Sequence, residues 1–299
     1  MLLEKALKFI IFEDFEKSST MKAVSSSSGE YLFKLSTTTE NALSEPMQFR
    51  EYTVLFIPKG EGIYHADFAT FAFKGPVLLF ATPYQVLQLE QQTPFESSML
   101  QFHGDFYCIE YHRVEVACNG LLFNNIYLQP CVKLSEAEAD SFKQLLIQMT
   151  GDESDIVLRA YLQLFLAKSS SIKIRSMAEA EPNGKDELME KFRELLDQHY
   201  LTLHKPNDYA KLLAMSPNNF TKRCKRYFKK SPSQLIQERL ILQAKKLLHL
   251  TRKGIKEIAY ELNFEDEFYF SRVFKKFTKV SPQTFRHETG ISIVADLSM

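Results

Sequence analysis

A repeat near the C-terminus limits the folds that are open to this chain. The stretch SPNNFTKRCKRYFKKSPSQL, residues 216–235, aligns with DEFYFSRVFKKFTKVSPQTF, residues 266–285. At an offset of 50 residues the matching pairs are Phe220 and Phe270, Lys222 and Arg272, Lys225 and Lys275, and Ser231 and Ser281. Upstream of each stretch lies a short apolar segment with a central alanine, Ala210 or Ala259. These features predict two copies of one helix-turn-helix unit, the second with a turn one residue longer.

Each copy carries a residue for the turn between its two helices. Asn263 ends the first helix of the second copy, and Asn is the commonest non-glycine residue in the left-handed conformation expected there. Ala214 stands at the same place in the first copy and fits that conformation less well. The next helix begins at an N-cap, which is Ser216 before Pro217 in the first copy and Asp266 in the second.

The second helix of each copy has an apolar face and a polar face. At 100° per residue the inward positions are Phe220, Cys224 and Tyr227 in the first copy and Phe270, Phe274 and Phe277 in the second. The outward positions are Asn218, Lys222 and Lys225 in the first copy and Phe268, Arg272 and Lys275 in the second. Arg and Lys can donate to guanine, Asn can pair with adenine, and an aromatic edge can contact a thymine methyl group. One basic helix alone is equally well explained as a solvated helix, but two matching outward faces favour recognition of DNA.

A single long helix is predicted between the two copies. PSQLIQERLILQAKKLLHL, residues 232–250, contains no Pro or Gly after its first residue. At 1.5 Å per residue this helix forms a rod of roughly 28 Å. One turn of B-DNA is about 34 Å long, so the two recognition helices could enter successive major grooves on one side of the duplex.

The charge of the chain is divided unevenly. The 299 residues include 37 Lys and Arg against 37 Asp and Glu, but from residue 181 onward there are 22 basic and 15 acidic residues. The C-terminal part therefore carries +7 and the rest −7, which indicates an acidic part joined to a part that binds polyanions. No apolar run approaches the roughly 20 residues of a transmembrane helix, so we expect a cytoplasmic protein without membrane contact.

The N-terminal part shows strand patterns followed by helical ones. Runs such as YTVLFIPKGEG and GPVLLFATPYQVLQLE are typical of strands joined by tight turns, and they predict a β-barrel or sandwich up to about residue 132. From Ser135 the apolar residues recur at helical spacing, which predicts helices at about 135–150 and 153–168. These helices could pair with a second subunit or pack on their own barrel. The polar stretch 169–185 is interpreted as a linker between a regulatory domain, 1–168, and a DNA-binding domain, 186–290.

Two stretches resemble a known family. IKEIAYELNFEDEFYFSRVFKKFTKVSPQTFR and AKLLAMSPNNFTKRCKRYFKKSPSQLIQERL closely resemble the two-motif DNA-binding domain of AraC/XylS-type transcription regulators over about residues 190–287. The family's usual glycines are replaced here by Asn263 and Lys229. The resemblance implies base-reading positions at Asn218, Thr221, Lys222, Glu267, Phe268, Ser271 and Arg272. It also implies a cupin-like N-terminal barrel that senses an effector or mediates dimerisation, with RNA polymerase as a partner.

The predicted fold is therefore α+β, with an N-terminal cupin-like β-barrel and helical hairpin before an all-α domain that holds two helix-turn-helix motifs. The predicted function is sequence-specific binding of double-stranded DNA by a transcription activator, as a homodimer and without cofactor, metal or catalytic residues. A small-molecule effector site is hypothesised at Tyr64, His65, Phe80 and Tyr84, with His65 as its polar anchor.

The alternative is a cupin-type metal-dependent enzyme with an appended helical domain. Such an enzyme would need several His and carboxylate side chains that converge on one site. His65, Asp67 and His103 are of the right type, but the sequence contains no H-x-H pair. A bound metal and catalysis are therefore not expected.

Overall fold

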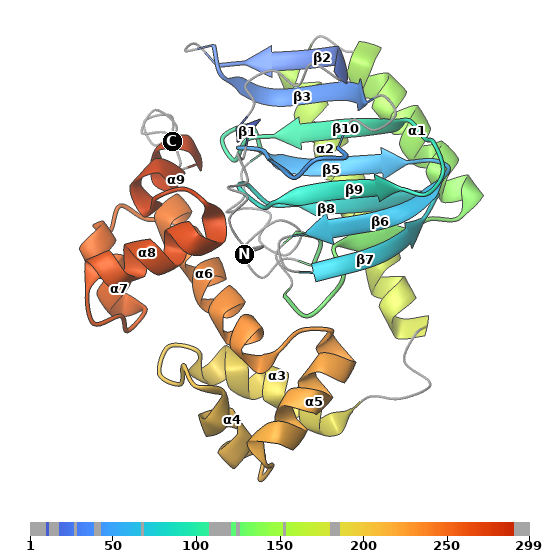
Figure 1. Ribbon diagram of the computed structural model, residues 1–299. Helices are drawn as coiled ribbons and strands as arrows, with labels where there is room; N and C mark the ends of the chain where they lie inside the picture. Colours follow the sequence, from blue (N-terminus) through green and yellow to red (C-terminus); the bar gives the residue numbers. More distant parts are fainter. Residues whose placement is uncertain are drawn as a thin grey trace, which may run out of the picture. The chain divides into compact units, whose positions relative to one another are not determined.

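The structure is a computed structural model that describes residues 10–11, 18–26, 29–38, 43–66, 69–107, 121–123, 126–151, 154–179 and 186–289. The chain divides into two compact units, which are Met1–Tyr107 with Lys133–Leu162, and Cys108–Val132 with Gln163–Met299. Strands make up most of the first unit and helices most of the second (Figure 1). The predicted α+β class is confirmed.

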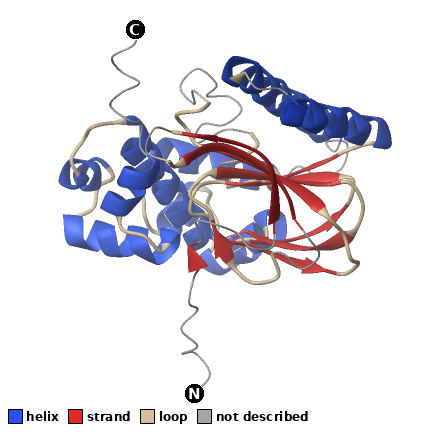
Figure 2. Cartoon of the chain, turned by 90° about the horizontal axis from the view of Figure 1, so that it is seen from above, coloured by secondary structure: helices blue, strands red, loops and turns tan. Residues whose placement is uncertain are grey.

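Two β-sheets, whose strands lie mostly in the first unit, face one another (Figure 2). One sheet has the order β1–β4–β9–β6–β7, formed by Ile10–Ile11, Met47–Gln48, Leu87–Gln91, Glu61–Ala66 and Ala69–Lys74. The other has the order β11–β8–β5–β10–β3–β2, formed by Cys131–Lys133, Val77–Ala81, Tyr52–Ile57, Ser97–Phe102, Tyr31–Thr38 and Ser18–Ser25. A hydrogen bond of 2.9 Å from the Tyr64 hydroxyl on β6 to the Phe80 carbonyl on β8 joins the two sheets. The predicted β-domain is thus present, and its assignment to the cupin type stays a prediction.

Two helices follow the strands. Helix α1, Glu136–Gly151, begins at a capping box, in which the Glu138 carboxylate accepts from the Ser135 amide at 2.8 Å and the Ser135 hydroxyl accepts from the Glu138 amide at 3.3 Å. The inward stripes of α1 and of the next helix, α2 (Asp155–Glu179), are buried within this chain. Their residues are Phe142, Leu145, Leu146 and Met149 on α1 and Leu158, Leu162, Phe165 and Leu166 on α2. These stripes are therefore covered by other residues of the same chain, and pairing of the two helices with a second subunit stays a prediction.

Helix α2 is longer than predicted. It spans Asp155–Glu179, so the interpretation of residues 169–179 as linker is wrong, and Ile172 and Lys173 within them are buried. The serine run that resembles a linker is accommodated because the Ser169 hydroxyl donates to the Phe165 carbonyl at 2.8 Å, one helical turn back. Residues 180–185 lie outside the described residues.

The C-terminal helices form the predicted repeat. They are α3 Glu187–His199, α4 Pro206–Leu212, α5 Pro217–Phe228, α6 Pro232–Leu250, α7 Ile255–Glu261, α8 Glu267–Thr278 and α9 Pro282–Thr289. Helices α4 and α5 form the first motif, and α7 and α8 form the second. Helix α6 runs between the motifs and contacts α4 and α5 as well as α7, α8 and α9 (Figure 1).

The turns of both motifs share one backbone geometry. Ala214 and Asn263 adopt positive φ angles of 52° and 59°. Directly after each of them an amide closes the turn, from Met215 to the Ala210 carbonyl at 2.8 Å and from Phe264 to the carbonyl of Ala259 at 2.9 Å. This six-to-one bond is the Schellman arrangement, which satisfies a helix-terminal carbonyl.

The recognition helices also end alike. Lys229 after α5 and Lys279 after α8 are left-handed C-caps with φ of 59° and 66°. Lysine thus occupies the position where the AraC/XylS resemblance implies glycine, and α5 still ends there.

Glycine at Ala214 should stabilise the chain. A left-handed conformation costs a residue with a Cβ about 1–2 kcal/mol, so Ala214→Gly should raise the free energy of unfolding by about 0.5–1 kcal/mol after the entropy of glycine is deducted. Asn263→Gly is the matched control and should gain less, because Asn tolerates this conformation better. Urea unfolding of the full chain, followed by circular dichroism, measures both. Destabilisation by Ala214→Gly would contradict the turn geometry.

Candidate nucleic-acid interface

Buried residues hold the two recognition helices in place. The buried inward positions, spaced by four residues, are Phe220, Cys224 and Phe228 on α5 and Phe270, Phe274 and Thr278 on α8. A four-residue spacing keeps each row on one side of its helix. Each recognition helix therefore turns one continuous stripe towards the core.

The third inward position of each helix differs from the prediction. The sequence pattern predicts Tyr227 and Phe277 there, but both are only half-buried. That prediction is wrong by one residue, because the buried row keeps the four-residue spacing as far as Phe228 and Thr278. Tyr227 instead donates its hydroxyl to the Glu190 carboxylate at 2.9 Å.

Aromatic rings fill the core behind each recognition helix. In the first motif the Phe192 ring of α3 meets the rings of Tyr209, Phe220 and Phe228 edge-on, with centroids 5.4, 4.9 and 6.1 Å away. In the second motif the Phe270 centroid lies 5.2 Å from that of Phe264 and 5.9 Å from that of Phe274. Edge-to-face contacts such as those of Phe192 add to the stabilisation from burial.

The predicted DNA-contacting residues lie on the outer faces of α5 and α8. Asn218, Lys222, Lys225, Phe268, Arg272 and Lys275 are exposed, while Thr221, Glu267 and Ser271 are half-buried beside them. The structure therefore brings these residues together as two groups, one on each recognition helix.

Three consecutive aromatic residues of α8 have different environments. Phe268 is 79% exposed, Tyr269 is 50% exposed and Phe270 is fully buried. The Tyr269 ring lies 5.9 Å from the Phe264 ring and 5.9 Å from the Arg272 guanidinium, so it contacts both the core and the outer face. The outward direction predicted for Phe268 is confirmed.

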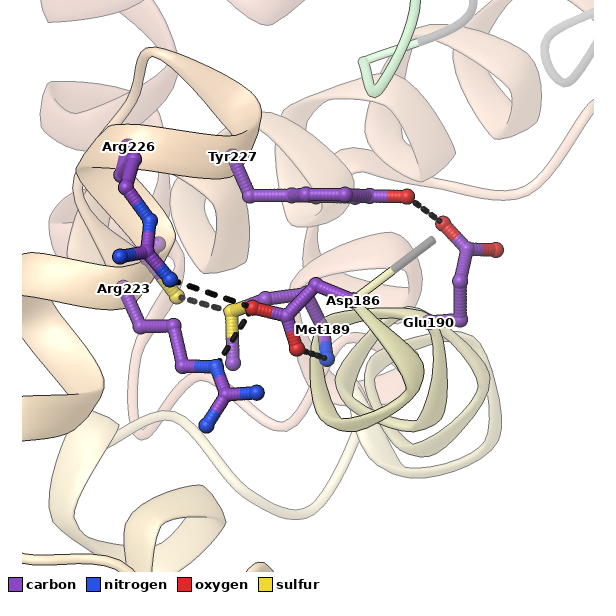
Figure 3. A network of polar contacts seen from close by, with 7 residues as sticks. Asp186, Met189, Glu190, Arg223, Arg226 and Tyr227 are labelled. Atoms are coloured by element: carbon purple, nitrogen blue, oxygen red, sulfur yellow. Dashed lines mark hydrogen bonds and ion pairs between the residues drawn. The ribbon is translucent and has the colours of Figure 1, made fainter. Parts of the chain in front are cut away.

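A polar network fastens α5 to the start of α3 (Figure 3). Asp186 caps α3 by accepting from the Met189 amide at 3.3 Å, and the same carboxylate accepts from the Arg223 guanidinium of α5. Arg226 lies 3.8 Å from this carboxylate. The hydrogen bond from Arg223 holds the pKa of Asp186 below its ordinary value, so the carboxylate is charged at neutral pH.

Sequence reasoning missed this network and one cation beside it. Arg226 has a side chain that is 77% exposed and follows Lys222 by one helical turn, so it shares the outer face. Its spacing from Lys222 is the signal that could have identified it. Asp186 gives no such signal, because its partner is 37 residues away in the sequence.

The structure separates His65 from Tyr64 and Phe80, with which it was hypothesised to form an effector site together with Tyr84. Tyr64, Phe80 and Tyr84 are buried in the β-domain, with exposed fractions of 1, 0 and 1%. His65 follows Tyr64 on strand β6 and therefore points to the opposite face, where its ring nitrogens lie 3.2 Å from the Thr70 hydroxyl and 2.9 Å from the Glu90 carboxylate. His65 cannot anchor a ligand in a pocket lined by Tyr64.

The described residues were also compared with what a metal site and a membrane-spanning helix require. Within the described ranges, no group of three or more His, Cys, Asp or Glu side chains is arranged to hold a metal ion. Asp67, which is of the right type for a ligand, lies outside those ranges. None of the helices in the described part of the chain combines the length and apolar character needed to cross a membrane.

Comparisons with known proteins agree with the sequence motifs. A family model described as a helix-turn-helix domain matches residues 209–288. The arabinose operon regulatory proteins of Salmonella typhimurium and Escherichia coli are each 48% identical to this chain over 50 residues, or 17% of its length. Those 50 residues are 18% and 17% of the two relatives, so the match spans less than a fifth of either. The crystal structure of ToxT from Vibrio cholerae is 16% identical, with 86% of this chain and 98% of that one covered, at a TM-score of 0.38.

The fold and the outer faces of α5 and α8 define the C-terminal part as a tandem helix-turn-helix domain. Its sequence motifs are of the AraC type, and over 50 residues it is similar to the two arabinose operon regulatory proteins.

Substitution of Phe268 and of Phe270 on α8 should change the free energy of unfolding by very different amounts. Phe270→Ala should lower the free energy of unfolding by about 3–5 kcal/mol, because it empties a buried site. Phe268→Ala should change it by less than about 0.5 kcal/mol, because that ring is exposed. Chemical denaturation of the two variants beside the wild type measures the difference. Equal losses would show that Phe268 belongs to the core.

Proposed function

We propose that this chain is a sequence-specific DNA-binding transcription regulator whose helices α5 and α8 enter successive major grooves. The observation that carries the proposal is the pair of matching outer faces, which are held by the same turn, the same buried row and the same C-cap in both motifs. The AraC-type domain and the excess of basic residues from residue 181 onward support it.

The two outer faces differ in chemistry, so we propose that they read different half-sites. Helix α5 presents an amide at Asn218 and cations at Lys222 and Lys225, which suit adenine, guanine and phosphate. Helix α8 presents Phe268 beside Arg272, which suits a thymine methyl group next to a guanine. A bipartite and asymmetric site is therefore expected.

We further propose that the chain acts as an activator in the cytoplasm, in contact with RNA polymerase. Control by a small molecule bound to the N-terminal domain stays part of this proposal, although not through a pocket built from Tyr64 and His65. A cupin-type metal-dependent enzyme is the competing function, and it predicts stoichiometric metal in the purified protein. Selection of bound sequences from a random DNA pool tests the main proposal, and a pool without enrichment would reject it.

A second copy of the chain is proposed to pair along the exposed side of α2. Ile156, Ala160, Ala167 and Ile174 are exposed and lie within about 40° of one another at 100° per residue. Ile156 is 79% exposed and Ile174 57% exposed, so a partner that covers this side of α2 would bury both isoleucines. The opposite side of α2 packs inside the chain and is not available for pairing.

Substitutions of two cations should separate two roles on α8. Arg272→Ala should weaken binding to the selected duplex by about 1–3 kcal/mol and relax the preference at one base position. Lys275→Ala should weaken binding to all sequences alike and reduce the salt slope by about 1, because it removes one phosphate contact. Fluorescence anisotropy titrations at several salt concentrations measure both effects. Wild-type affinity in Arg272→Ala would contradict the groove-facing assignment.

Pairing through α2 should be sensitive to charge. Ile156→Glu should turn a dimer into a monomer, because a buried unpaired carboxylate opposes association. Met21→Glu, at a residue of strand β2 that is 47% exposed, is the control and should leave the oligomeric state unchanged. Analytical ultracentrifugation measures the state of each. A wild-type monomer at all concentrations, or a dimeric Ile156→Glu, would exclude this face.

A further inference from the structure

The first motif depends on a short segment from much earlier in the chain. Ile126 and Tyr127 pack against the core that α3, α4, α5 and α6 share, although α3 begins only at Glu187. Residues 108–132 belong to the same compact unit as residues 163–299. The segment Ile126–Gln129 is therefore an integral part of the unit that contains both motifs.

Tyr127 contacts two elements of this core, α5 and α3. Its ring centroid lies 5.7 Å from that of Phe228, the last residue of α5, and the Arg193 guanidinium of α3 lies 5.9 Å from the ring. Its hydroxyl donates to the Asp197 carboxylate at 3.3 Å. Burial, followed by the nearby Asp197 charge, raises the pKa of Tyr127 above its ordinary value, so the hydroxyl remains a donor.

Two lysines hold the backbone on either side of Tyr127. The Lys230 ammonium, two residues beyond the end of α5, donates to the Ile126 carbonyl at 3.1 Å and pairs with Glu238 of α6 at 2.6 Å. The buried Lys173 ammonium of α2 donates to the Gln129 carbonyl at 2.7 Å. Burial lowers the pKa of Lys173 to about 8. Hydrogen bonds thus join the segment both to the residues that follow α5 and to α2.

The second motif has different residues at the same place. At the offset of 50, Phe228 corresponds to Thr278 and Lys230 to Val280. The Thr278 hydroxyl donates to the Phe274 carbonyl of its own helix at 2.9 Å, and Val280 is buried. The first motif instead places a large ring and a cation at these positions, and both of them contact Ile126–Gln129. The two motifs therefore differ in what completes them.

We propose that Tyr127 is a positioning residue for the first recognition helix. It holds the C-terminal end of α5, and so it sets how Lys222 and Lys225 meet DNA, while α8 is unaffected. This inference rests on the proposed function for its effect on DNA. The selective effect on α5 can be measured without any DNA.

Hydrogen exchange of the full chain without DNA is the first test. Tyr127→Ala should speed the exchange of α5 and α3 amides about tenfold or more, and leave α8 unchanged, because the lost contacts are limited to the first motif. Tyr127→Phe keeps the ring and should lie close to wild type. Tyr260→Ala, at an exposed tyrosine of α7, is the matched control and should leave α5 unchanged. If Tyr127→Ala fails to fold, Tyr127→Leu keeps much of the volume and should show the same change confined to α5 and α3.

Binding to the duplex that the wild type selects from a random pool is the second test. Lys222→Ala and Arg272→Ala assign its two half-sites to α5 and α8. Tyr127→Ala should bind the intact duplex about tenfold more weakly, and scrambling the α5 half-site should then cost little more. Wild-type exchange and affinity in Tyr127→Ala, or equal losses at both half-sites, would overturn the inference. A pool without enrichment would reject the proposed function and leave the exchange result to decide the role of Tyr127.

Discussion

The backbone turn between the helices of each motif is the constraint on which the recognition helices depend. A left-handed residue followed by a six-to-one hydrogen bond sets the direction in which α5 leaves α4 and α8 leaves α7. The small side chains of Ala210 and Ala259 are buried at this point, which allows the helices to approach closely. A larger residue there would push the helices apart, so the outer faces would lose their common orientation.

The buried rows then fix the rotation of each recognition helix about its own axis. Because Phe270 and Phe274 lie in the core, helical geometry places Phe268 and Arg272 on the opposite, outward side of α8. In α5 the network around Asp186 adds a second restraint, because it joins Arg223 to the N-terminus of α3. Rotation and direction together determine which side chains are available to a ligand.

Much of this domain could be predicted because its signals are local and occur twice. The repeat located the helices and the turn at Asn263, and the spacing of apolar residues assigned the outward direction of Phe268. Other features depend on distant residues and left no periodic trace. Tyr127 and Asp186 meet partners far away in the sequence, and the serine run in α2 has the composition of a linker although it is helical. His65 does not share a face with Tyr64, because neighbouring residues of a strand face opposite sides of the sheet.

The dependence of the first motif on Ile126–Gln129 has a consequence for how this protein can be divided. A fragment cut at the boundary that the sequence suggests, residue 186, would contain both motifs, but the core behind the first motif would lack Ile126 and Tyr127. The side of Phe228 that Tyr127 covers would then face water in the fragment. The two motifs of the excised fragment would therefore differ in stability, and the less stable motif would be the one that contains α5.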